Sequence, residues 1–472
     1  MTSERTSTKT AARARASRLI ATILFAAPAI AWIASSDSGH DFLEPFANPS
    51  GVAQTFSTTG RIDMENPFFQ SLGTNGRTCF TCHRPENAWT ITPASVRERF
   101  ETSAGLDPIF RTNDGSNSPN ADVSTVEARR IAYSMLLTKG LIRVGLGLPP
   151  DAEFTIDSVD DPYGFASSHE LSLFRRPAPS TNLTFLSTVM WDGRETFPGQ
   201  TISFDLLDQA NAATTGHAQG IPLSSDQRRQ ILDFETSLFT AQVYDVAAGD
   251  LRTQGAKGGP KPLSRQEFYI GINDPLGLNP KGIPFNRVVF TDFAAWARLK
   301  SSHGDDDEED EGRTAARLAV ARGEDLFNTK PINITGVKGL NDDLGVAVIA
   351  GTCTTCHDTP NVGDHSVAAP LDIGLTDASR RTPDMPLYTL RNKATGETIQ
   401  TTDPGRALVT GKWKHIGRFK GPVLRGLAAR APYFHNGSAA TLTDAVTFYN
   451  ARFAIGLTDA EISDIVAFLR VQ

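Results

Sequence analysis

The spacing of apolar and polar residues predicts helices in this chain more often than strands. Apolar residues recur every three or four positions between Ala315 and Phe327, which is the spacing of one face of a helix. The same pattern predicts helices over residues 123–141, 225–248, 287–299, 442–451 and 459–470. Strict alternation of apolar and polar positions, which indicates a half-buried strand, is scarce. We therefore expect a mainly α fold.

Other segments favour loops and a linker. Residues 105–120, 146–163 and 252–284 are rich in Gly, Pro, Asp and Asn, which favour turns. Seven acidic residues follow one another from Asp305 to Glu311. Because like charges repel, this run predicts a solvated linker over residues 301–312. The chain then divides into a first domain of residues 40–300, with long loop insertions, and a second of residues 313–472.

An apolar run at residues 19–34 predicts a targeting segment. Basic residues precede it, and small residues that suit a cleavage site occur at 29–31 and 34–36. The run has 16 residues, interrupted by Thr22 and Pro28, whereas a membrane-spanning helix needs ~20. We expect residues 1–36 to be a secretory signal peptide and the mature protein to be periplasmic, without stable membrane insertion. An uncleaved anchor is the alternative.

Composition and charge narrow the class of protein. The chain has 472 residues, of which 39% are hydrophobic and 21% are charged, as in a globular protein. The formal net charge is −7, and residues 1–31 carry five positive charges and one negative, so the mature chain carries −11. Seven of these negative charges lie in the acidic run. The chain therefore has no basic character that would predict a nucleic-acid partner.

The cysteines carry the clearest chemistry. The four form two pairs with two residues between the members, and a histidine follows each pair. Cys-x-x-Cys-His attaches c-type haem. Two thiols three positions apart on one turn can reach the two vinyl groups of a porphyrin, and the next imidazole then ligates the iron. We expect two covalent haem c groups, attached at Cys79, Cys82 and His83 and at Cys353, Cys356 and His357.

Other uses of paired cysteines explain less. A zinc site with four thiolate ligands would join pairs about 270 residues apart and leave both histidines without a role. Two disulfides would suit an exported protein, but a histidine after each pair would then be a coincidence. A thioredoxin-like site requires a βαβ setting that the pattern does not show.

Two further passages accompany the haem motifs. One is Met-Trp-Asp-Gly-Arg at residues 190–194, followed by Gln-Ala at 209–210. The other is Pro-Val-Leu-Arg-Gly at 422–426 with Ala-Pro-Tyr-Phe-His-Asn-Gly-Ser at 431–438. With these passages the chain resembles the bacterial di-haem cytochrome c peroxidase family, including its MauG-like branch. The resemblance covers the haem-binding parts and leaves much of 90–165 and 225–300 without a counterpart.

The resemblance implies two cytochrome c-like domains with the haems near the domain interface. The haem on His83 would meet hydrogen peroxide, and the haem on His357 would be six-coordinate and relay electrons. Trp191 would lie between the haems, and Gln209 would lie in the peroxide pocket. The family also implies a calcium ion at the interface, for which the sequence offers no readable ligand set.

The sixth ligand of the second haem departs from the peroxidases of the family. They use a methionine near the end of the chain, whereas Tyr449 stands at the matching position here, as in the MauG-like branch. A phenolate is a hard anionic ligand that stabilises high oxidation states. The alternative is that Met385 ligates the iron and Tyr449 is a packed helix residue.

The peroxide pocket departs from the family as well. Ala213 stands where the family has a proline, and the position of the family's acid–base glutamate falls near His217. His217 could transfer protons, ligate the first iron and close the pocket, or do neither. His169, which precedes Trp191 by some two dozen residues, is a rival ligand.

Three residues in the passages at 190–194, 422–426 and 431–438 have less definite roles. His435 is expected near the second haem without ligating it. Arg194 and Arg425 either pair with haem propionates or form ordinary buried salt bridges.

These features predict a periplasmic di-haem oxidoreductase that uses hydrogen peroxide. It would act either as a peroxidase or as a MauG-like oxidase of a protein substrate. Its partners would be a small redox protein, as electron donor or acceptor, and in the second case the protein substrate. The alternative is a di-haem electron-transfer cytochrome with both irons six-coordinate and no catalysis.

Overall fold

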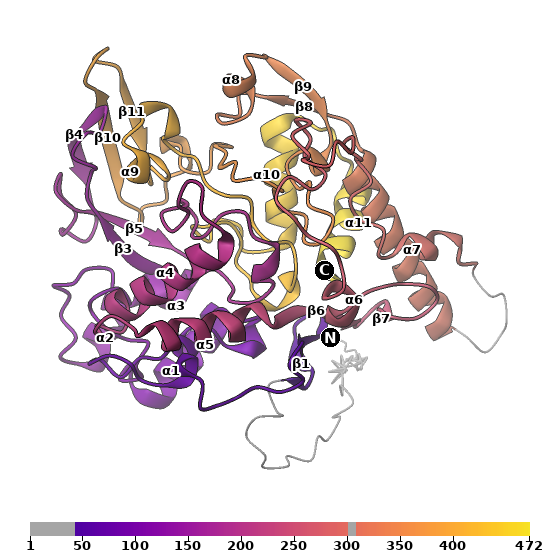
Figure 1. The fold of residues 1–472 in the computed structure, drawn as a ribbon, viewed down its shortest axis with the longest axis horizontal. Coiled ribbons are helices and arrows are strands. Elements are labelled where there is room, and N and C mark those ends of the chain that lie inside the picture. The colour runs from indigo at the N-terminus through magenta and orange to yellow at the C-terminus, as the bar shows by residue number, and fades with distance from the viewer. Residues whose placement is uncertain (1–42, 301–307) are drawn as a thin grey trace, which may run out of the picture. The chain divides into compact units, whose positions relative to one another are not determined.

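Strands and helices share this fold. The computed structural model describes residues 43–300 and 308–472, so the predicted signal peptide and part of the predicted linker lie outside the described residues. Helices make up 32% of the structure and strands 16%. The prediction of a mainly α fold was therefore wrong, because four small sheets accompany the helices in the described residues (Figure 1).

Helices and strands follow one another along the chain without a repeating pattern. The α-helices of the described residues are α1 (Pro93–Ser103), α2 (Val126–Ala132), α3 (Ser134–Lys139), α4 (Ile202–Gly216), α5 (Ser225–Thr236), α6 (Pro260–Leu263), α7 (Glu308–Thr329), α8 (Asn341–Leu344), α9 (Ala407–Thr410), α10 (Leu442–Phe453) and α11 (Asp459–Arg470). The strands are β1 (Phe46–Asn48), β2 (Gly51–Ser57), β3 (Ile142–Leu146), β4 (Phe154–Asp160), β5 (Leu171–Arg175), β6 (Leu238–Asp245), β7 (Gly249–Asp250), β8 (Ile332–Thr335), β9 (Val348–Gly351), β10 (Leu387–Asn392) and β11 (Thr398–Thr401). Short 3-10 helices are η2 (Pro67–Phe69), η3 (Cys79–Thr81), η4 (Pro85–Asn87), η5 (Leu183–Phe185), η6 (Ala294–Arg298), η7 (Cys353–Thr355), η8 (Ala378–Arg380), η9 (Trp413–His415) and η10 (Leu427–Ala429).

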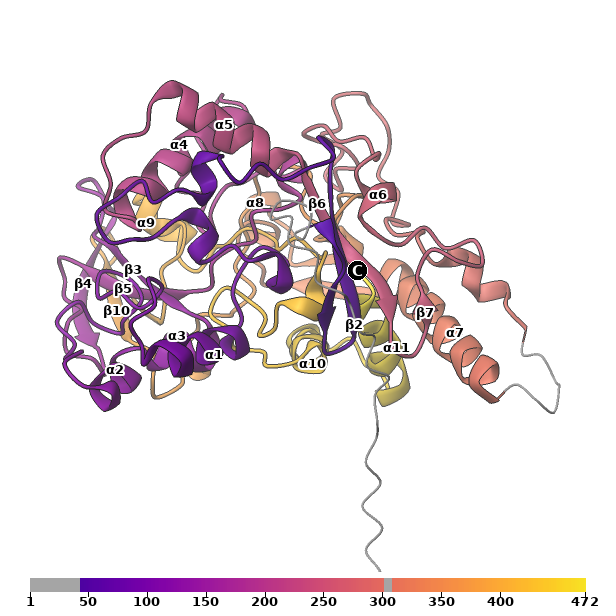
Figure 2. The ribbon, with the colours of Figure 1, turned by 90° about the horizontal axis from the view of Figure 1, so that it is seen from below.

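The sheet with the order β1-β2-β6-β7 explains why strands escaped the sequence pattern. Strand β2 does alternate, but its buried positions carry Gly51, Ala53, Thr55 and Ser57, none of which is a large apolar residue. Its antiparallel partner β6 is buried at all but one position. Such a strand has no solvent-exposed face, and its residues were included in a helix predicted over 225–248. Figure 2 shows β2 and β6 side by side.

A second sheet, with the order β11-β10-β4, joins segments more than 200 residues apart. Strands β4 and β10 pair antiparallel, as the upper left of Figure 1 shows. Helix α7 begins at Glu308, so the last five residues of the predicted linker belong to a helix. The division of the chain into two domains at residues 301–312 stays a prediction.

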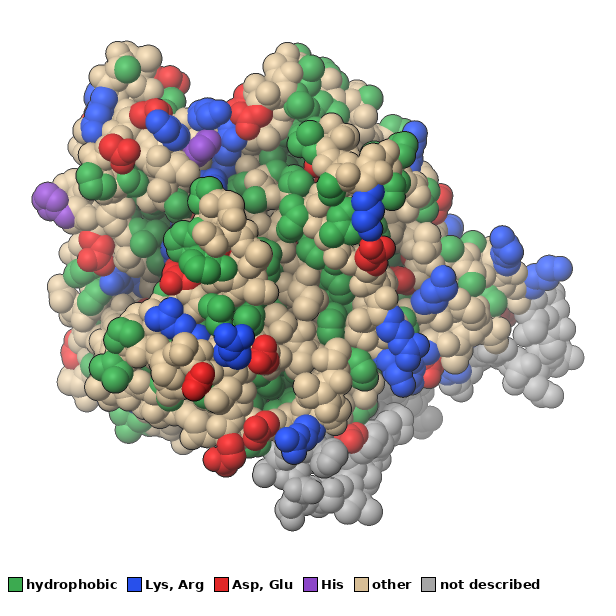
Figure 3. All heavy atoms as spheres, in the orientation of Figure 1, with side chains coloured by type: hydrophobic (Ala, Val, Ile, Leu, Met, Phe, Trp, Pro, Cys, Tyr) green, Lys and Arg blue, Asp and Glu red, His purple; other side chains and the backbone are tan. Residues whose placement is uncertain are grey.

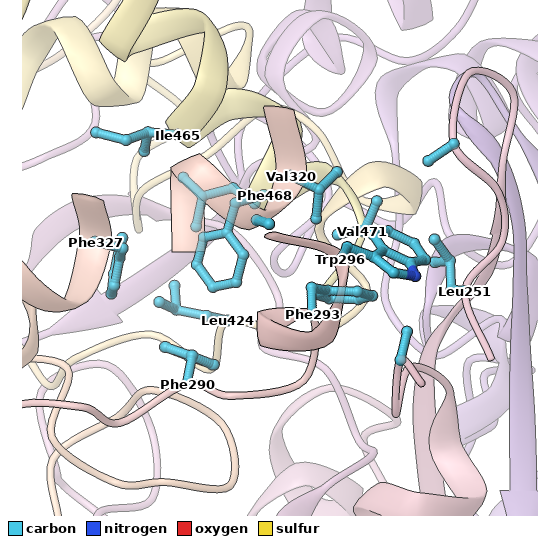
Figure 4. Close-up of a cluster of buried hydrophobic side chains, with 14 of the residues drawn as sticks. Leu251, Phe290, Phe293, Trp296, Val320, Phe327, Leu424, Ile465, Phe468 and Val471 are labelled. Carbon is cyan, nitrogen blue, oxygen red and sulfur yellow. The ribbon is translucent and has the colours of Figure 1, made fainter. Parts of the chain in front are cut away.

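The helices of the C-terminal part pack around an aromatic core (Figure 4). The ring of Phe468 on α11 lies 5.1 Å from that of Phe290 and 5.6 Å from that of Phe327 on α7. A Cβ atom at Gly323 of α7 would lie 1.9 Å from the carbonyl oxygen of Asp464, so glycine permits this close approach of α7 and α11.

The helix predictions had mixed outcomes. The predictions over 442–451 and 459–470 are confirmed as α10 and α11. The predicted helix at 123–141 is two short helices, α2 and α3, and that at 287–299 is reduced to the 3-10 turn η6. No helix of the described ranges is long and apolar enough to cross a membrane. Acidic and basic side chains are interspersed on the face drawn in Figure 3.

A buried ion network joins the passage at 190–194 to both halves of the chain. Arg175, at the end of β5, donates to both carboxylate oxygens of Asp403 at 2.7 and 2.9 Å, and to Asp192 at 2.5 Å. Asp192 is completely buried and also accepts from Arg194 at 3.1 Å. Burial acts to raise the pKa of Asp192, but Arg175 and Arg194 outweigh it and bring the pKa to about 2. The network thus requires an ionised Asp192.

We expect Asp192→Asn to destabilise the protein by about 3 kcal/mol at pH 7, because a buried cation loses one of its partners. The folded pKa of about 2 lies below the unfolded value of ~3.9, so this stabilisation is present above pH ~4 and is lost as the pH falls toward 2. Denaturant unfolding at pH 7 and pH 3 measures the difference. Asp250→Asn, which removes an exposed partner of Arg252, serves as the control. An equal loss at both pH values would contradict the prediction.

Candidate haem sites and the residues between them

Both Cys-x-x-Cys-His motifs adopt the same local structure. Each begins a 3-10 turn, η3 or η7, and a threonine caps each turn. The backbone N–H of Thr78 donates to the hydroxyl of Thr81 at 2.9 Å, and that of Thr352 donates to the hydroxyl of Thr355 at 3.0 Å. The four cysteines are free. The two motifs therefore present their thiols on equivalent turns.

The histidine of each motif is held through one ring nitrogen. Nδ1 of His83 lies 2.9 Å from the carbonyl oxygen of Trp89, and Nδ1 of His357 lies 2.7 Å from that of Gly363. A carbonyl can only accept, so Nδ1 carries the proton and Nε2 is left with a free lone pair. Burial lowers the pKa of both histidines to about 4. Both imidazoles are therefore neutral at pH 7, as an iron ligand must be.

The backbone that holds His83 is locally strained. Ala88 and Trp89 both have left-handed conformations, with φ of 52° and 58°. This conformation costs a non-glycine residue about 1–2 kcal/mol. The indole of Trp89 is fully buried and donates to Thr55 on β2 at 2.9 Å. Strand β2 therefore helps to keep the carbonyl of Trp89 in position.

The first motif opens into two adjoining spaces. Both are lined by His83, Gln209, Ala213 and His217, and the cysteines line one of them. Helix α4 carries Gln209 and ends at Gly216, so His217 stands at its C-terminal cap. The structure thus brings His83 together with two of the predicted peroxide-pocket residues, around one cavity.

A buried carboxylate holds His217. Nδ1 of His217 lies 2.5 Å from Oδ2 of Asp114, and the other oxygen of Asp114 pairs with Arg77. Burial acts to raise the pKa of Asp114, but His217 and Arg77 outweigh it and hold the pKa below its ordinary value. An ionised Asp114 accepts the Nδ1 proton, so Nε2 is the nitrogen left for the cavity. The imidazole remains 39% exposed.

A second acid, Glu235 at the end of α5, lines the same two spaces. It is 6% exposed, and in the described part of the chain its side chain makes no hydrogen bond or ion pair. Burial raises its pKa to about 8, so its carboxyl is protonated at pH 7. Asp114 and Glu235 could not be predicted as site residues, because nothing in the sequence indicates that they approach a motif far away along the chain.

The second motif opens into a larger, mostly apolar cavity of about 1680 Å³, its open mouth included. Cys353, Cys356 and His357 line it together with Tyr449 of α10. The rings of Tyr449 and His357 are 6.4 Å apart, and burial raises the pKa of Tyr449. Met385 packs elsewhere, against Met135, Leu141 and Phe174, and does not line this cavity.

Trp191 lines both the first and the second cavity. Its indole N–H donates to the carbonyl oxygen of Arg176 at 2.8 Å. Its ring lies 6.2 Å from that of His435, which stacks on Phe419 at 3.9 Å. His435 is 1% exposed, neither of its ring nitrogens has a hydrogen-bond partner, and burial lowers its pKa to about 4. Aromatic rings therefore connect the two cavities.

The remaining predicted residues have clear positions. His169 is exposed and lines neither cavity. Arg194 lines the first cavity and pairs with Asp192, whereas Arg425 forms a buried salt bridge with Asp292 at 3.0 Å. Within residues 43–300 and 308–472, no three His, Cys, Asp or Glu side chains converge on a metal position. The two cysteine pairs therefore do not form a joint zinc site.

Comparison with known proteins supports the family resemblance. The chain is 31% identical over 147 residues to a cytochrome-c peroxidase (IdrP1) of Denitromonas iodatirespirans, covering 26% of this chain and 38% of the relative. It is 33% identical over 244 residues to cytochrome c551 peroxidase of Nitrosomonas europaea, covering 50% of this chain and 62% of the relative. A third relative is cytochrome c peroxidase Ccp of Escherichia coli, 42% identical over 73 residues, or 15% of this chain and 16% of the relative.

These matches each span less than two thirds of the relative's length. No family model matches the chain. A solved structure of a MauG-like protein associated with microbial copper homeostasis aligns with a TM-score of 0.37 at 15% identity, over 86% of this chain and 85% of that one. Over these segments the chain is similar to bacterial cytochrome c peroxidases, as its motifs indicated, and haem c is the cofactor that this similarity implies.

Both cavities fit a covalently attached haem. Each combines a thiol pair on one turn with a neutral histidine whose Nε2 is free. Burial raises the pKa of Cys79, Cys353 and Cys356 to about 12, so these thiols are uncharged. Because these thiols and imidazoles are uncharged, no charge has to be buried when an apolar porphyrin packs against them.

We expect Glu235→Gln to stabilise the protein at neutral pH, because the wild-type carboxyl must stay protonated in the folded state. The folded pKa of about 8 lies above the unfolded value of ~4.3, so the wild type loses about 1.4 kcal/mol per pH unit relative to the variant as the pH rises between these values. Chemical unfolding at pH 5, 6 and 7 measures this trend. Glu98→Gln, at an exposed position of α1, is the control. A difference that does not change with pH would contradict the prediction.

Proposed function

We propose that this protein is an exported di-haem oxidoreductase that reduces hydrogen peroxide, with one haem c in each half of the chain. The observation that carries the proposal is the difference between the two cavities. His83 shares its cavity with a histidine that a carboxylate orients, whereas His357 shares its cavity with a phenol. The first cavity is thus equipped to transfer protons, and the second is equipped to complete the coordination of an iron.

The reaction sets the demands on the residues. Reduction of hydrogen peroxide to two water molecules takes up two electrons and two protons. Bound haem supplies an iron that binds peroxide and electrons that cleave its O–O bond. The chain must therefore bind and orient the peroxide, move two protons and provide a path for the electrons.

His217 is the proton-transfer group in this proposal. Its Nε2 accepts a proton from one oxygen of hydrogen peroxide and returns it to the other, which leaves as water. Asp114 keeps the proton on Nδ1 and stabilises the imidazolium that forms in between. The carboxamide of Gln209 lines the same cavity and can hold the peroxide by a hydrogen bond.

Glu235 and Trp191 are the remaining residues to which this proposal gives a role. Glu235 carries a proton at pH 7, since burial raises its pKa to about 8, and it can supply one of the two protons that the second water needs. The other proton comes from solvent through the partly exposed His217. Trp191 lines both cavities and offers the path for electrons between the haems. The electrons come from a small redox protein or, as the MauG-like resemblance implies, from side chains of a protein substrate. The predicted signal peptide would place this reaction in the periplasm.

The test begins with purified holoprotein. A pyridine haemochrome assay should find two haems per chain, and the ferric spectrum should contain one high-spin and one low-spin signal. We expect His217→Ala to lower kcat for peroxide reduction by about 10²–10⁴-fold, without loss of haem, because a proton-transfer group typically contributes that much. Asp114→Asn should lower kcat and shift its pH profile, since it removes the charge that stabilises the imidazolium.

The exposed His169→Ala is the matched control and should retain full activity. Two low-spin signals in every redox state, with no reaction on addition of peroxide, would identify an electron-transfer cytochrome instead. Full activity of His217→Ala would refute the assignment of the proton-transfer group.

We propose Tyr449 as the sixth ligand of the second haem. Tyr449→Phe keeps the ring packing against Phe434 and Phe448 but removes the oxygen. We expect the low-spin ferric signal to change in electron paramagnetic resonance, while the high-spin signal stays as in the wild type. Met385→Leu, which leaves the cavity lining intact, should change neither signal. The opposite pattern would assign Met385 as the ligand.

A further inference from the structure

Three cationic side chains meet where the two cavities adjoin. Arg176, Lys420 and Arg430 line the second cavity and also the space that reaches His83. Trp191 lies among them, because its indole donates to the carbonyl oxygen of Arg176 and its own carbonyl accepts from the backbone N–H of Lys420 at 2.9 Å. We call these three residues the junction cations.

Arg176 sits in a cage of backbone carbonyls. Its guanidinium donates to the carbonyl oxygens of Lys139 at 2.9 Å, Ile91 at 2.8 Å and Arg430 at 3.0 Å. The first two belong to the N-terminal half and the third to the C-terminal half. Arg176 is 5% exposed, and burial lowers its pKa to about 9, with the charge of Arg430 acting in the same direction. A guanidinium here still carries its charge at pH 7.

The other two junction cations also lack anionic partners. Lys420 donates to the carbonyl oxygen of Thr188 at 3.1 Å, and Arg430 donates to the carbonyl oxygens of Arg425 and Val423. Burial lowers the pKa of Lys420 although Asp364 acts in the opposite direction, and the two groups form no ion pair. Among the described residues, none of the three cations pairs with a carboxylate within 4.0 Å.

Three buried positive charges without an anion are costly. A buried charge that lacks its partner typically destabilises a protein by several kcal/mol, and carbonyl dipoles offset only part of this. Anions bound in the cavities would therefore stabilise these three buried cations. Each haem carries two propionates, so two haems bring four carboxylates to this region. Arginine suits such groups because its planar fork can bind a carboxylate through two hydrogen bonds.

The surroundings of Arg176 do not fit the calcium ion that the family resemblance implies. Calcium takes six to eight oxygen ligands, among them backbone carbonyls such as those of Ile91, Lys139 and Arg430. Here the three carbonyl oxygens accept hydrogen bonds from a guanidinium, so they are not available to a metal ion. No group of three or more His, Cys, Asp or Glu side chains within the described ranges offers another metal position. The residues between the cavities do not fit calcium.

We propose that Arg176, together with Lys420 and Arg430, binds haem propionates where the two cavities adjoin. The guanidinium of Arg176 takes the place that a calcium ion would otherwise occupy. The guanidinium joins the two halves through the carbonyls of Ile91, Lys139 and Arg430. The three positive charges offset three of the four negative charges that the propionates of both haems carry. This inference rests on the two haems of the proposed function, but not on the reaction with peroxide.

The first experiment tests the calcium part on wild-type holoprotein. Midpoint potentials of both haems are measured by spectroelectrochemical titration, in excess EGTA and in millimolar calcium chloride. We expect the same potentials and the same thermal unfolding midpoint in both solutions. A calcium-dependent shift of either potential would overturn the proposal, because the haems would then respond to an ion that Arg176 is proposed to replace. Peroxide is absent throughout, so a failure of the peroxidase proposal would leave this result unaffected.

The second experiment removes the charge with Arg176→Met. Loss of a cation beside a propionate stabilises the ferric state, so the midpoint potential of at least one haem should fall. A tenfold change in the one-electron equilibrium constant corresponds to 59 mV, and we expect a shift of at least this size. The potential should also become more pH-dependent between pH 6 and 8, since the propionate loses the charge that keeps it ionised. Arg176→Lys should restore most of the potential.

Three more variants keep the proposal testable. If Arg176→Met does not fold, Lys420→Met and Arg430→Gln should lower the potentials by themselves. Arg425→Gln is the matched control, because Arg425 is a buried arginine that pairs with Asp292 and lines neither cavity. Its loss should affect stability and leave both potentials unchanged. Unchanged potentials in all variants of the junction cations, or an equal shift in Arg425→Gln, would refute the assignment.

Discussion

The structure depends on one repeated interaction, the hydrogen bond from Nδ1 of a motif histidine to a backbone carbonyl. This bond decides which ring nitrogen stays free and how the imidazole is oriented, so it determines where an iron can be bound. The carbonyl of Trp89 holds His83, and the carbonyl of Gly363 holds His357. In the first motif two consecutive left-handed residues are needed to turn that carbonyl toward the ring. The buried indole of Trp89 and its bond to β2 keep this strained turn in place. The sheet that the sequence pattern did not predict therefore supports the first candidate haem site.

The two sites share this histidine geometry and differ in the other residues that line each cavity. The first faces the end of α4, where Asp114 orients His217, and the second faces α10, which presents Tyr449. A partly exposed imidazole can exchange protons with solvent, whereas a buried phenol among aromatic rings can complete a coordination sphere. In the proposed function this difference separates the iron that meets peroxide from the iron that relays electrons. In the proposed function, α4 and α10 therefore distinguish the two sites, whereas the motifs make them alike.

Two neighbouring arginines between the cavities connect the N-terminal and C-terminal halves of the chain. Arg175 ties Asp192 to Asp403, and the neighbouring Arg176 ties two carbonyls of the N-terminal half to the carbonyl of Arg430. The first arginine is neutralised by carboxylates of the protein, and the second is not. Within its described residues, the protein therefore supplies carboxylate partners for Arg175 but none for Arg176. Haem propionates are the carboxylates that the proposed cofactors bring to Arg176.

The sequence by itself determined the local features, and the tertiary structure decided the rest. Motifs such as Cys-x-x-Cys-His act within five residues, and helices such as α10 and α11 follow from periodicity along one segment, so both could be predicted. Strand β2 could not, because its buried face is made of small and polar residues whose burial depends on its partner β6. The pair of Asp114 and His217 spans 103 positions, and the cage around Arg176 joins carbonyls as far apart as Ile91 and Arg430. Interactions of this kind are set by which segments the fold brings together, and no pattern within a single segment records them.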